Sequence, residues 1–376
     1  MEPDWIWQQP GWPSFYWRDQ EITAQLRPVR LLLGVLIGKT SAIHETADLN
    51  FSLDNMLSNI LASSAIENER LNAQPVRSSL ARRLGIGEDN PCPITDRSEG
   101  LAEMMFDAVT ELGRPLTLER LLTWHTCLFP HNTLAVYKIQ VGKLRVDEPM
   151  QVVSGRIDKP IIHFLAPPRN ILEPELSHFL NWFNHPLPEA DRQLDPLLRA
   201  AISHFWFITL HPFDDGNGRI ARALTDLALA QADNQPARLY AMSTAILARR
   251  QDYYQILERC QRGTLDITPW LAWFLDTLQA TLELALATVN QTLIKTRFWQ
   301  NFQDIELSAE QKNVLNRLLN GGEKGFSSGI NATQYQRVAK VSKATATRHL
   351  ADLLAKGCLE KFPGGGRSTR YRIAAV

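Results

Sequence analysis

The sequence predicts a mainly α-helical protein with one small β-hairpin in the middle and a separate domain at the C-terminal end. Apolar residues recur at helical spacing along most of the chain, beginning with residues 18–38. The segments 150–153 and 161–164 instead have the composition of short β-strands that flank a turn. The last segment, 308–376, combines three helical stretches with two short strands. These observations place the chain in the mainly α class.

Length and charge limit the possible organisation. A chain of 376 residues is long enough for two or three domains, each with its own core. We divide it into an N-terminal helical region (1–112), a helical core (113–298) and a C-terminal domain (299–376). The 40 lysines and arginines balance 40 aspartates and glutamates, so the whole chain carries no charge that would steer a partner. An electrostatic partner must therefore be inferred from local clusters.

The four cysteines are scattered along the chain and include no CxxC pair. This spacing argues against a zinc site and against a disulfide scaffold, and it fits the reducing cytoplasm. The N-terminus has neither the basic nor the apolar region of a signal peptide. No apolar run reaches the ~18 residues that a membrane span needs. We therefore expect a cytoplasmic protein without a membrane partner.

The first 17 residues are rich in tryptophan and proline. The prolines predict an extended arm, and we expect its aromatic side chains to anchor it on a neighbouring surface. A peptide- or ligand-binding role for this arm stays open. The helix that follows, 18–38, should end at Gly38. Residues 34–40 resemble a phosphate-binding loop, but the glycine spacing is one residue short and the segment follows a helix.

Further helices precede the hairpin. Residues 52–84 predict one helical block, and the segment 85–99, rich in Gly, Pro and Asp, predicts a loop. Helices follow at 101–112 and, after a Thr117 cap, at 118–128.

The β-hairpin is the exception in an otherwise helical core. A lone hairpin is only marginally stable, so we expect it to have a functional purpose, with a purely structural hairpin as the alternative. Its strand residues are Met150, Gln151, Val152 and Val153, followed after the turn by Ile161, Ile162, His163 and Phe164.

A strongly apolar helix, 197–210, should be buried and should deliver His211 to a site on a rigid element. We expect His204, within this helix, to be a core histidine. A second long apolar helix, 269–298, leads to the last domain.

The stretch 210–224 carries the chemistry. Gly216 and Gly218 allow backbone conformations that a side chain forbids, so successive N–H groups can line an anion-binding concavity. The residues that follow favour a helix, and a helix N-terminus attracts phosphate. Arg219 and Arg222 share one face of that helix and can bind phosphate oxygens bidentately.

Two residues beside this turn have complementary roles. Asp215 is a hard oxygen ligand of the kind that holds Mg²⁺ together with substrate phosphates. His211 titrates near neutral pH and can accept a proton from a hydroxyl group. The stretch therefore predicts a site that binds a polyphosphate and removes a proton.

Residues 211–222 carry the pattern His-Pro-Phe-x-(Asp/Glu)-Gly-Asn-Gly-Arg-x-x-Arg at every defined position. The chain thereby resembles the Fic family (the Fic/Doc superfamily), most of whose members transfer AMP from ATP to a hydroxyl group of a target protein. In the Doc-like phosphotransfer branch a lysine stands at the position of Gly218, so the glycine here favours AMP transfer.

The resemblance implies a role for each matched position. His211 would be the general base that deprotonates the target hydroxyl, and Asp215 would hold Mg²⁺. The residues implied to bind the phosphates of ATP are Gly216, Asn217, Gly218, Arg219 and Arg222.

A second family pattern, (Ser/Thr)-x-x-x-Glu-(Gly/Asn), matches Ser63, Glu67 and Asn68. The resemblance implies an inhibitory helix whose glutamate pairs with Arg222. A carboxylate there would occupy the γ-phosphate position and leave the α-phosphate wrongly turned for in-line attack. The alternative is an ordinary surface glutamate.

The resemblance also implies roles for the hairpin and for a tyrosine. The matching hairpin of the family, the flap, binds a target segment by adding it as a strand. Family tyrosines in the helix after the motif often border the adenine. The adjacent Tyr253 and Tyr254 face different sides of a helix, so at most one can stack there, and Tyr254 is the candidate. Gly142 and Arg145 match the lead-in to the flap, with no role visible from the sequence.

Residues 308–376 resemble a winged helix-turn-helix domain. From Gly321 onward ten lysines and arginines face three acidic residues. This basic excess within a neutral chain favours DNA as a partner, and a protein-docking or dimerising module is the alternative. The candidate DNA contacts are Lys343, Thr345, Thr347 and Arg348 in the third helix and Arg367 and Arg370 in the wing.

We therefore expect a Mg²⁺-dependent transfer of AMP from ATP to a Tyr, Ser or Thr hydroxyl, with release of pyrophosphate and restraint by Glu67 on Arg222. A DNA-binding transcriptional regulator with a nucleotide-sensing core is one alternative. Phosphate transfer, or removal of AMP with Glu67 positioning water, is another. The target protein is unknown, and self-modification and a homodimer stay open.

Overall fold

The computed structural model describes residues 4–40, 45–88, 90–130, 139–146, 149–156, 159–185, 194–233, 239–321, 326, 329–362 and 369–374. The chain forms two compact units, Met1–Glu283 and Leu284–Val376. Phe298, which we expected at the end of the core, packs in the hydrophobic core of the second unit. The expected limits 1–112, 113–298 and 299–376 stay a prediction.

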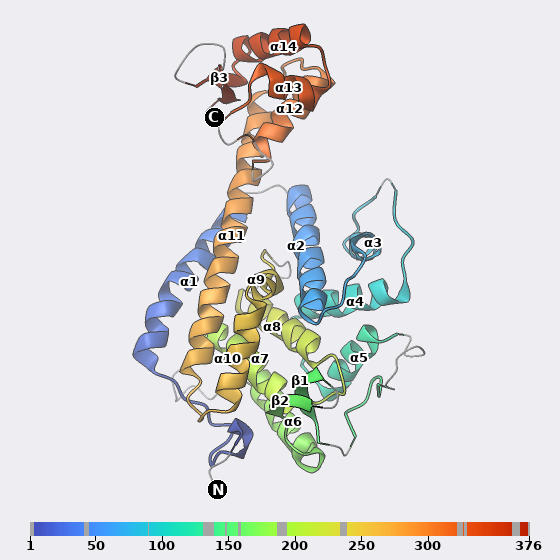
Figure 1. Cartoon of the computed structure of the whole chain (residues 1–376), viewed down its shortest axis with the longest axis vertical. Coiled ribbons are helices and arrows are strands. Elements are labelled where there is room, and N and C mark those ends of the chain that lie inside the picture. Colours follow the sequence, from blue (N-terminus) through green and yellow to red (C-terminus); the bar gives the residue numbers. More distant parts are fainter. Residues whose placement is uncertain are drawn as a thin grey trace. The chain divides into compact units, whose positions relative to one another are not determined.

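The first unit is mainly helical, with one two-stranded antiparallel sheet in the described part of the unit. Figure 1 shows the course of its helices. Their bounds are α1 (Asp19–Thr40), α2 (Glu45–Ile66), α3 (Ala73–Arg83), α4 (Asp96–Thr110), α5 (Leu118–Leu128), α6 (Arg169–Asn184), α7 (Pro196–Leu210), α8 (Asn217–Asp233), α9 (Met242–Ala248), α10 (Arg250–Gln261) and α11 (Thr268–Asn301).

Helices α7 and α8 pack along each other in the middle of this unit, with α2, α4 and α5 against α8 and α6 against α7 (Figure 1). Asp195 caps α7 by accepting a hydrogen bond from Leu197 N, and Pro196 occupies the first helical position. Nearly every side chain of α7 is buried, as its apolar sequence predicts. The end of α7 therefore holds the residues that follow it on a rigid support.

The N-terminal arm is anchored as its aromatic composition predicts. Trp5 is buried and packs edge-on against Phe164 with 5.4 Å between ring centroids. Trp7 Nε1 donates a hydrogen bond to Leu165 O at 2.8 Å, and Trp12 Nε1 donates to Glu175 at 2.7 Å. The arm thus packs against the hairpin and α6.

Three expected helix limits are wrong. Helix α1 continues through Gly38 to Thr40, whose hydroxyl closes the last turn by donating to Leu36 O and Ile37 O. The block 52–84 is divided into α2 and α3, because Asn68 adopts a left-handed conformation that interrupts the helix. Helix α4 begins at Asp96, five residues before the expected start, because Thr95 caps it.

The hairpin consists of β1 (Gln151–Arg156) and β2 (Lys159–Leu165). Gln151 pairs with Leu165 and Arg156 with Lys159, with an irregularity of register between Val152 and Val153.

The second unit contains the end of α11, then α12 (Ala309–Leu319), α13 (Ala332–Ala339), α14 (Lys343–Ala355), β3 (Leu359–Lys361) and β4 (Tyr371–Ile373). Strands β3 and β4 pair antiparallel, and Ile330 forms a bridge with Tyr371. Ser342 caps α14 as expected. The core of the second unit includes side chains from each of these helices, such as Val314, Tyr335 and Leu350.

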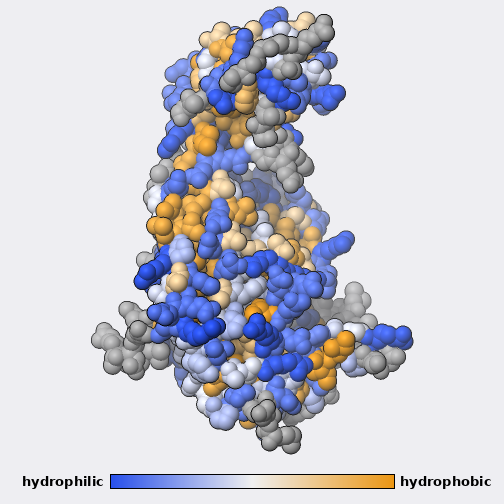
Figure 2. Space-filling view, turned by 60° about the vertical axis from the view of Figure 1, so that its left-hand side comes forward, coloured by the Kyte–Doolittle hydropathy of each residue, from blue (hydrophilic) through white to orange (hydrophobic). Residues whose placement is uncertain are grey.

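All four cysteines are free thiols. In the part of the chain that the structure describes, no helix has both the length and the apolar character of a membrane span. On the face shown in Figure 2, hydrophobic side chains are interspersed with polar ones. Leu31 and Val35 of α1 are among the exposed large hydrophobic residues.

Candidate active site at the junction of helices α7 and α8

His211 ends α7 in a left-handed conformation with φ 50° and ψ 58°. Its Nδ1 lies 3.1 Å from Ile208 O. A carbonyl oxygen can only accept, so Nδ1 carries the proton and Nε2 is left as the acceptor. Burial lowers the pKa of His211 to about 4. The imidazole is therefore neutral at physiological pH.

Arg145, which the sequence singled out without a role, supports this histidine. Its side chain is buried, and Nε donates to His211 O at 2.9 Å. Its backbone N donates to Pro212 O at 3.0 Å, and Nη2 donates to Pro167 O. Burial lowers its pKa to about 10, which still leaves it charged at neutral pH. Arg145 thus joins the end of α7 to the segment that follows the hairpin.

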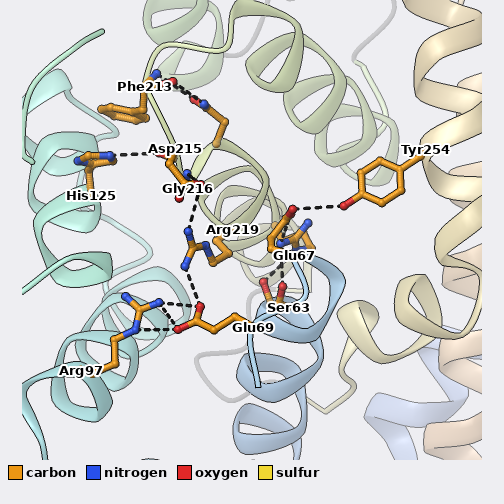
Figure 3. Close-up of polar contacts among 12 residues, drawn as sticks. Ser63, Glu67, Glu69, Arg97, His125, Phe213, Asp215, Gly216, Arg219 and Tyr254 are labelled. Atoms are coloured by element: carbon orange, nitrogen blue, oxygen red, sulfur yellow. Dashed lines mark hydrogen bonds and ion pairs between the residues drawn. The ribbon is translucent and has the colours of Figure 1, made fainter. Parts of the chain in front are cut away.

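His125 of α5, which sequence reasoning missed, supports the loop after His211. Its Nδ1 accepts a hydrogen bond from Gly142 N at 2.9 Å, so Nε2 carries the proton and donates to Asp215 O at 3.2 Å. Burial lowers its pKa and keeps the ring neutral. The ring also stacks on Phe213 at 4.3 Å (Figure 3).

Asn217 closes the same loop. Its side-chain Oδ1 accepts from Phe213 N at 3.0 Å, and its Nδ2 donates to Phe213 O at 2.7 Å. The side chain is therefore committed to the loop. Because α8 begins at Asn217, Ile220 N donates to Gly216 O, whereas the N–H groups of residues 217–219 precede the first helical carbonyl within reach and can point to an anion.

The two glycines meet different constraints. Gly216 has φ +85°, a conformation that L side chains rarely adopt. Gly218 has an ordinary φ, but a Cβ on it would overlap Glu67 Oε1. The carboxylate of Glu67 therefore lies directly over the first turn of α8.

Arg222 is bound by Ser63 and by Glu67 at the end of α2. Nη2 lies 2.8 Å from Glu67 Oε1 and 2.9 Å from Ser63 O, and Nε donates to Ser63 Oγ at 2.8 Å. Burial opposes the ionisation of Glu67, but Arg222 and Arg219 outweigh it and lower the pKa of Glu67. The structure thus brings together the Ser63, Glu67 and Arg222 that the sequence paired.

Asn68 follows Glu67 with φ 62°. Only glycine and, to a lesser degree, asparagine adopt this conformation readily, which explains the residue types of the pattern at this position. Asn68 Oδ1 also accepts from Arg250 Nη1 of α10 at 2.9 Å.

Arg219 is held by a second carboxylate that sequence reasoning missed. Its Nη1 lies 2.8 Å from Glu69 Oε2, and Glu69 is in turn bound by Arg97 of α4 at 2.5 Å (Figure 3). Arg219 also stacks over Phe129 at 5.0 Å. A glutamate two residues after Glu67 in the same turn was the signal that could have identified this pair.

Asp215 has a side chain that is 54% exposed. Its Oδ1 accepts from Gly216 N at 2.5 Å and lies 3.3 Å from Arg219 Nη2. The described residues form no cluster of three or more His, Cys, Asp or Glu side chains that could hold a metal. A magnesium ion shared with nucleotide phosphates needs only one or two carboxylates, and an exposed Asp215 beside the phosphate turn fits that mode.

A cavity of about 620 Å³ joins these features. It is lined by His211 and the turn from Asp214 to Gly218, by Glu67 and Asn68, and by residues of the hairpin and of α10. Arg219 and Arg222 instead line a separate small space of about 10 Å³ on the side of α2 and α4. The turn that carries Glu67 and Glu69 binds both arginines, so a phosphate must displace these carboxylates or share the arginines with them.

Some of the proposed flap residues line this cavity, and others pack against the N-terminal arm. Val153 and Ile161 are at least half exposed, and Ile162 is 39% exposed. Phe164 is buried against Trp5. Met150 lies one residue before β1 and packs in the same cluster. The cavity-lining members of the predicted set are Gln151, Val152, Val153, His163 and Phe164.

The two adjacent tyrosines face different sides, as expected. Tyr253 is buried and hydrogen-bonds His204 at 2.9 Å, which makes His204 a core residue. Tyr254 is 38% exposed and lines the cavity, and its hydroxyl lies 3.2 Å from Glu67 Oε2. Tyr254 therefore contacts Glu67 as well as the space where we expect the adenine.

The candidate DNA contacts belong to the second unit. Lys343, Thr347 and Arg348 are exposed on α14, whereas the side chain of Thr345 is half-buried beside its cap. Arg370 Nη1 donates to Gly329 O at 2.9 Å. Arg367 lies outside the described residues.

Comparison with known proteins shows which families the chain resembles. Residues 5–86 match a domain of unknown function (DUF4172), and residues 115–229 match the Fic/DOC family. The protein adenylyltransferase Fic of Aedes aegypti is 26% identical over 258 residues, 66% of this chain and 46% of that protein. The protein adenylyltransferase fic-1 of Caenorhabditis briggsae is 28% identical over 183 residues, 48% of this chain and 31% of that protein. The chain thus spans less than half the length of these relatives.

Solved structures show the fold. A Fic family protein from Desulfovibrio desulfuricans G20 aligns with a TM-score of 0.54 at 21% identity and covers 96% of this chain and 98% of its own. Fic-1 of C. elegans aligns with a TM-score of 0.50 at 19% identity, with 72% of this chain and 74% of its own covered. Residues 115–229 are thus similar in sequence to the Fic/DOC family, and the chain shares its fold with a solved Fic family protein.

Proposed function

We propose that this chain is a protein adenylyltransferase that transfers AMP from ATP to a Tyr, Ser or Thr hydroxyl of a target protein. The observation that carries the proposal is the position of His211. Its ring is neutral, its proton is fixed on Nδ1 by Ile208 O, and it lines one cavity with the N-terminal turn of α8. The names of the curated relatives support AMP as the transferred group.

The reaction follows from these groups. Nε2 of His211 accepts the proton of the target hydroxyl, whose oxygen forms a bond to the α-phosphorus of ATP. The bond to the β-phosphate breaks, and pyrophosphate leaves. The unpartnered N–H groups at the start of α8, with Arg219 and Arg222, stabilise the phosphate charge, and this positioning supplies most of the rate. Mg²⁺, which Asp215 would hold, neutralises phosphate charge when bound.

We further propose that the enzyme is restrained at both arginines. Glu67 occupies Arg222, and Glu69 occupies Arg219. A nucleotide phosphate must compete with each carboxylate for a guanidinium group.

The proposal is tested with α-³²P-ATP and Mg²⁺ on the wild-type chain, Glu67→Gly and His211→Ala, alone and with a cell lysate. Label on protein should rise in Glu67→Gly and disappear in His211→Ala. Transfer by His211→Ala at the wild-type rate would contradict the mechanism. Parallel reactions with γ-³²P-ATP should give no label, and label there would establish phosphate transfer instead.

The same assay addresses the remaining alternatives. Label on the isolated chain would establish self-modification. Loss of label from a previously modified target, on addition of the wild-type chain without ATP, would establish removal of AMP. A homodimer, which stays a prediction, is measured by sedimentation.

The second unit supports a second candidate function, DNA binding by a transcriptional regulator. Lys343, Thr347 and Arg348 form an exposed group on α14, which we propose as the recognition helix of a winged helix-turn-helix. A randomised duplex library should select a sequence, and Lys343→Ala with Arg348→Ala should abolish that selection. Binding that ignores sequence would leave only non-specific attraction to phosphate.

A further inference from the structure

The register of the hairpin contains a β-bulge. Val152 pairs with Phe164 and Val153 pairs with Ile162, so His163 is an extra residue on β2. A bulge bends its strand and redirects a side chain, and bulges are common beside active sites. Here the redirected side chain is an imidazole that lines the cavity.

His163 joins three elements through one ring. Its Nδ1 lies 2.8 Å from Glu258 Oε2 of α10, and its Nε2 lies 2.6 Å from Ser154 Oγ of β1. In a neutral ring, Nδ1 donates to the carboxylate, and Nε2 accepts from the serine hydroxyl. Strand β2 therefore contacts α10 directly through His163, and β1 is joined to the same ring through Ser154.

The outer side of β2 is fixed by further contacts. Arg262 Nη2 donates to Ile162 O at 2.8 Å, its Nε lies 3.4 Å from Glu258 Oε1, and Trp5 packs under its guanidinium group at 4.3 Å. Trp7 Nε1 donates to Leu165 O. Arg262 and Trp7 thus donate hydrogen bonds to carbonyl oxygens of β2. Most residues of β1 are exposed. A target strand would therefore add to β1.

One face of α10 connects the flap to the turn after α2 that carries Glu67 and Asn68. Three residues of α10 and the C-cap residue of this helix recur every four positions and so lie on one side of it: Arg250, Tyr254, Glu258 and Arg262. Arg250 binds Asn68 and Tyr254 contacts Glu67 at one end, while Glu258 and Arg262 bind the hairpin at the other. The position of the flap across the cavity from His211 is thus set by α10.

We propose that His163 and Glu258 are positioning residues that fix the flap on α10, so that a target strand on β1 presents its hydroxyl group to His211. This inference rests on the proposed function. Its physical content is a hydrogen bond from His163 Nδ1 to an oxygen of the side chain at position 258, which locates the flap on α10.

The test uses the full chain in the Glu67→Gly background with Glu258→Ala, Glu258→Gln and a control, Glu173→Ala. Gln keeps an oxygen that accepts from Nδ1, so it should rescue what Ala loses. Glu173 is an exposed residue of α6 that pairs with Arg169 of the same helix. The readouts are amide hydrogen exchange of the hairpin and α-³²P-AMP transfer to lysate protein, titrated separately in ATP and in lysate.

We expect Glu258→Ala to raise exchange of the hairpin amides and the half-saturating lysate concentration by about tenfold, with the half-saturating ATP concentration unchanged. Glu258→Gln and Glu173→Ala should match the background. Unchanged exchange and lysate dependence in Glu258→Ala, or equal loss in the Ala and Gln variants, would overturn the proposal. Absence of label in every variant would refute the proposed function, while exchange would still decide whether Glu258 fixes the flap.

Discussion

His211 has the two properties that a general base needs, a fixed proton on one nitrogen and a vacant lone pair on the other. The fixed proton comes from a local contact, since Ile208 is only three residues earlier in α7. The lowered pKa comes from packing, because the ordinary value near 6.5 falls to about 4 on burial. The sequence identified the residue, whereas its protonation state depends on neighbours that packing supplies.

Glu69 should be a restraint in its own right. Replacing Glu69 by Gln removes the charge that binds Arg219, so ATP should bind more tightly, with the half-saturating concentration lowered about three- to tenfold. Combined with Glu67→Gly, the substitution should increase AMP transfer beyond either single change. The measurement is α-³²P-AMP transfer against ATP concentration.

Glu103→Gln is the matched control for this experiment. Glu103 is half exposed and pairs with Arg83 at 3.6 Å, away from both motif arginines. It should leave the ATP dependence unchanged. Weaker ATP binding in Glu69→Gln would instead mean that Glu69 orients Arg219 for the phosphate.

Among the elements, the end of α2 has the greatest consequence for the site. The helix ends at Ile66, and the turn that follows places Glu67 over Gly218 and Glu69 against Arg219. The sequence predicted one helical block from 52 to 84 and placed no break at this turn. The signal for the break was the conformational preference of Asn68.

Asn68 substitutions should separate backbone conformation from side-chain chemistry. Asn68→Val places a β-branched residue at φ 62°, which should lower the free energy of unfolding by about 1–2 kcal/mol and raise AMP transfer by loosening Glu67. Asn68→Gly should keep both close to wild type, apart from the lost contact with Arg250. Urea unfolding and the labelling assay measure the two effects. Equal behaviour of Val and Gly would show that the backbone conformation does not matter.

At the scale of the whole molecule, acid should destabilise the fold because buried histidines must stay neutral. Burial lowers the pKa of His204 to about 3 and that of His211 to about 4. In the unfolded chain these rings titrate near 6.5, so below that pH the unfolded state binds more protons and stability falls. The loss begins near pH 6.5 and continues down to the folded pKa values.

For His204 alone, the free energy of unfolding should fall by about 2 kcal/mol between pH 7 and pH 5. Urea unfolding of the wild type and His204→Gln at both pH values measures it. The amide can hydrogen-bond Thr225 and Tyr253 but cannot be protonated, so the variant should lose about 2 kcal/mol less on acidification. Identical pH dependence of the two proteins would contradict this origin.

The helices with strong local signals were predictable, because caps and apolar periodicity are properties of neighbouring residues. The Thr117 cap with its helix α5, and the fully apolar α7, illustrate this. The motif from His211 to Arg222 was predictable for the same reason, since a glycine turn before a helix forms a phosphate site within one short segment.

The contacts between distant segments were decided only by the tertiary structure. His125 under Asp215, Glu69 on Arg219 and His163 on Glu258 each join residues that are 90 or more positions apart. Sequence spacing constrains neighbours along one helix or strand, but packing selects which of many charged side chains meet across the molecule. The residue types of the candidate site therefore follow from one local segment of the sequence. The protonation of His211, the pairing of the motif arginines with Glu67 and Glu69, and the contacts of the hairpin arise from how the helices pack.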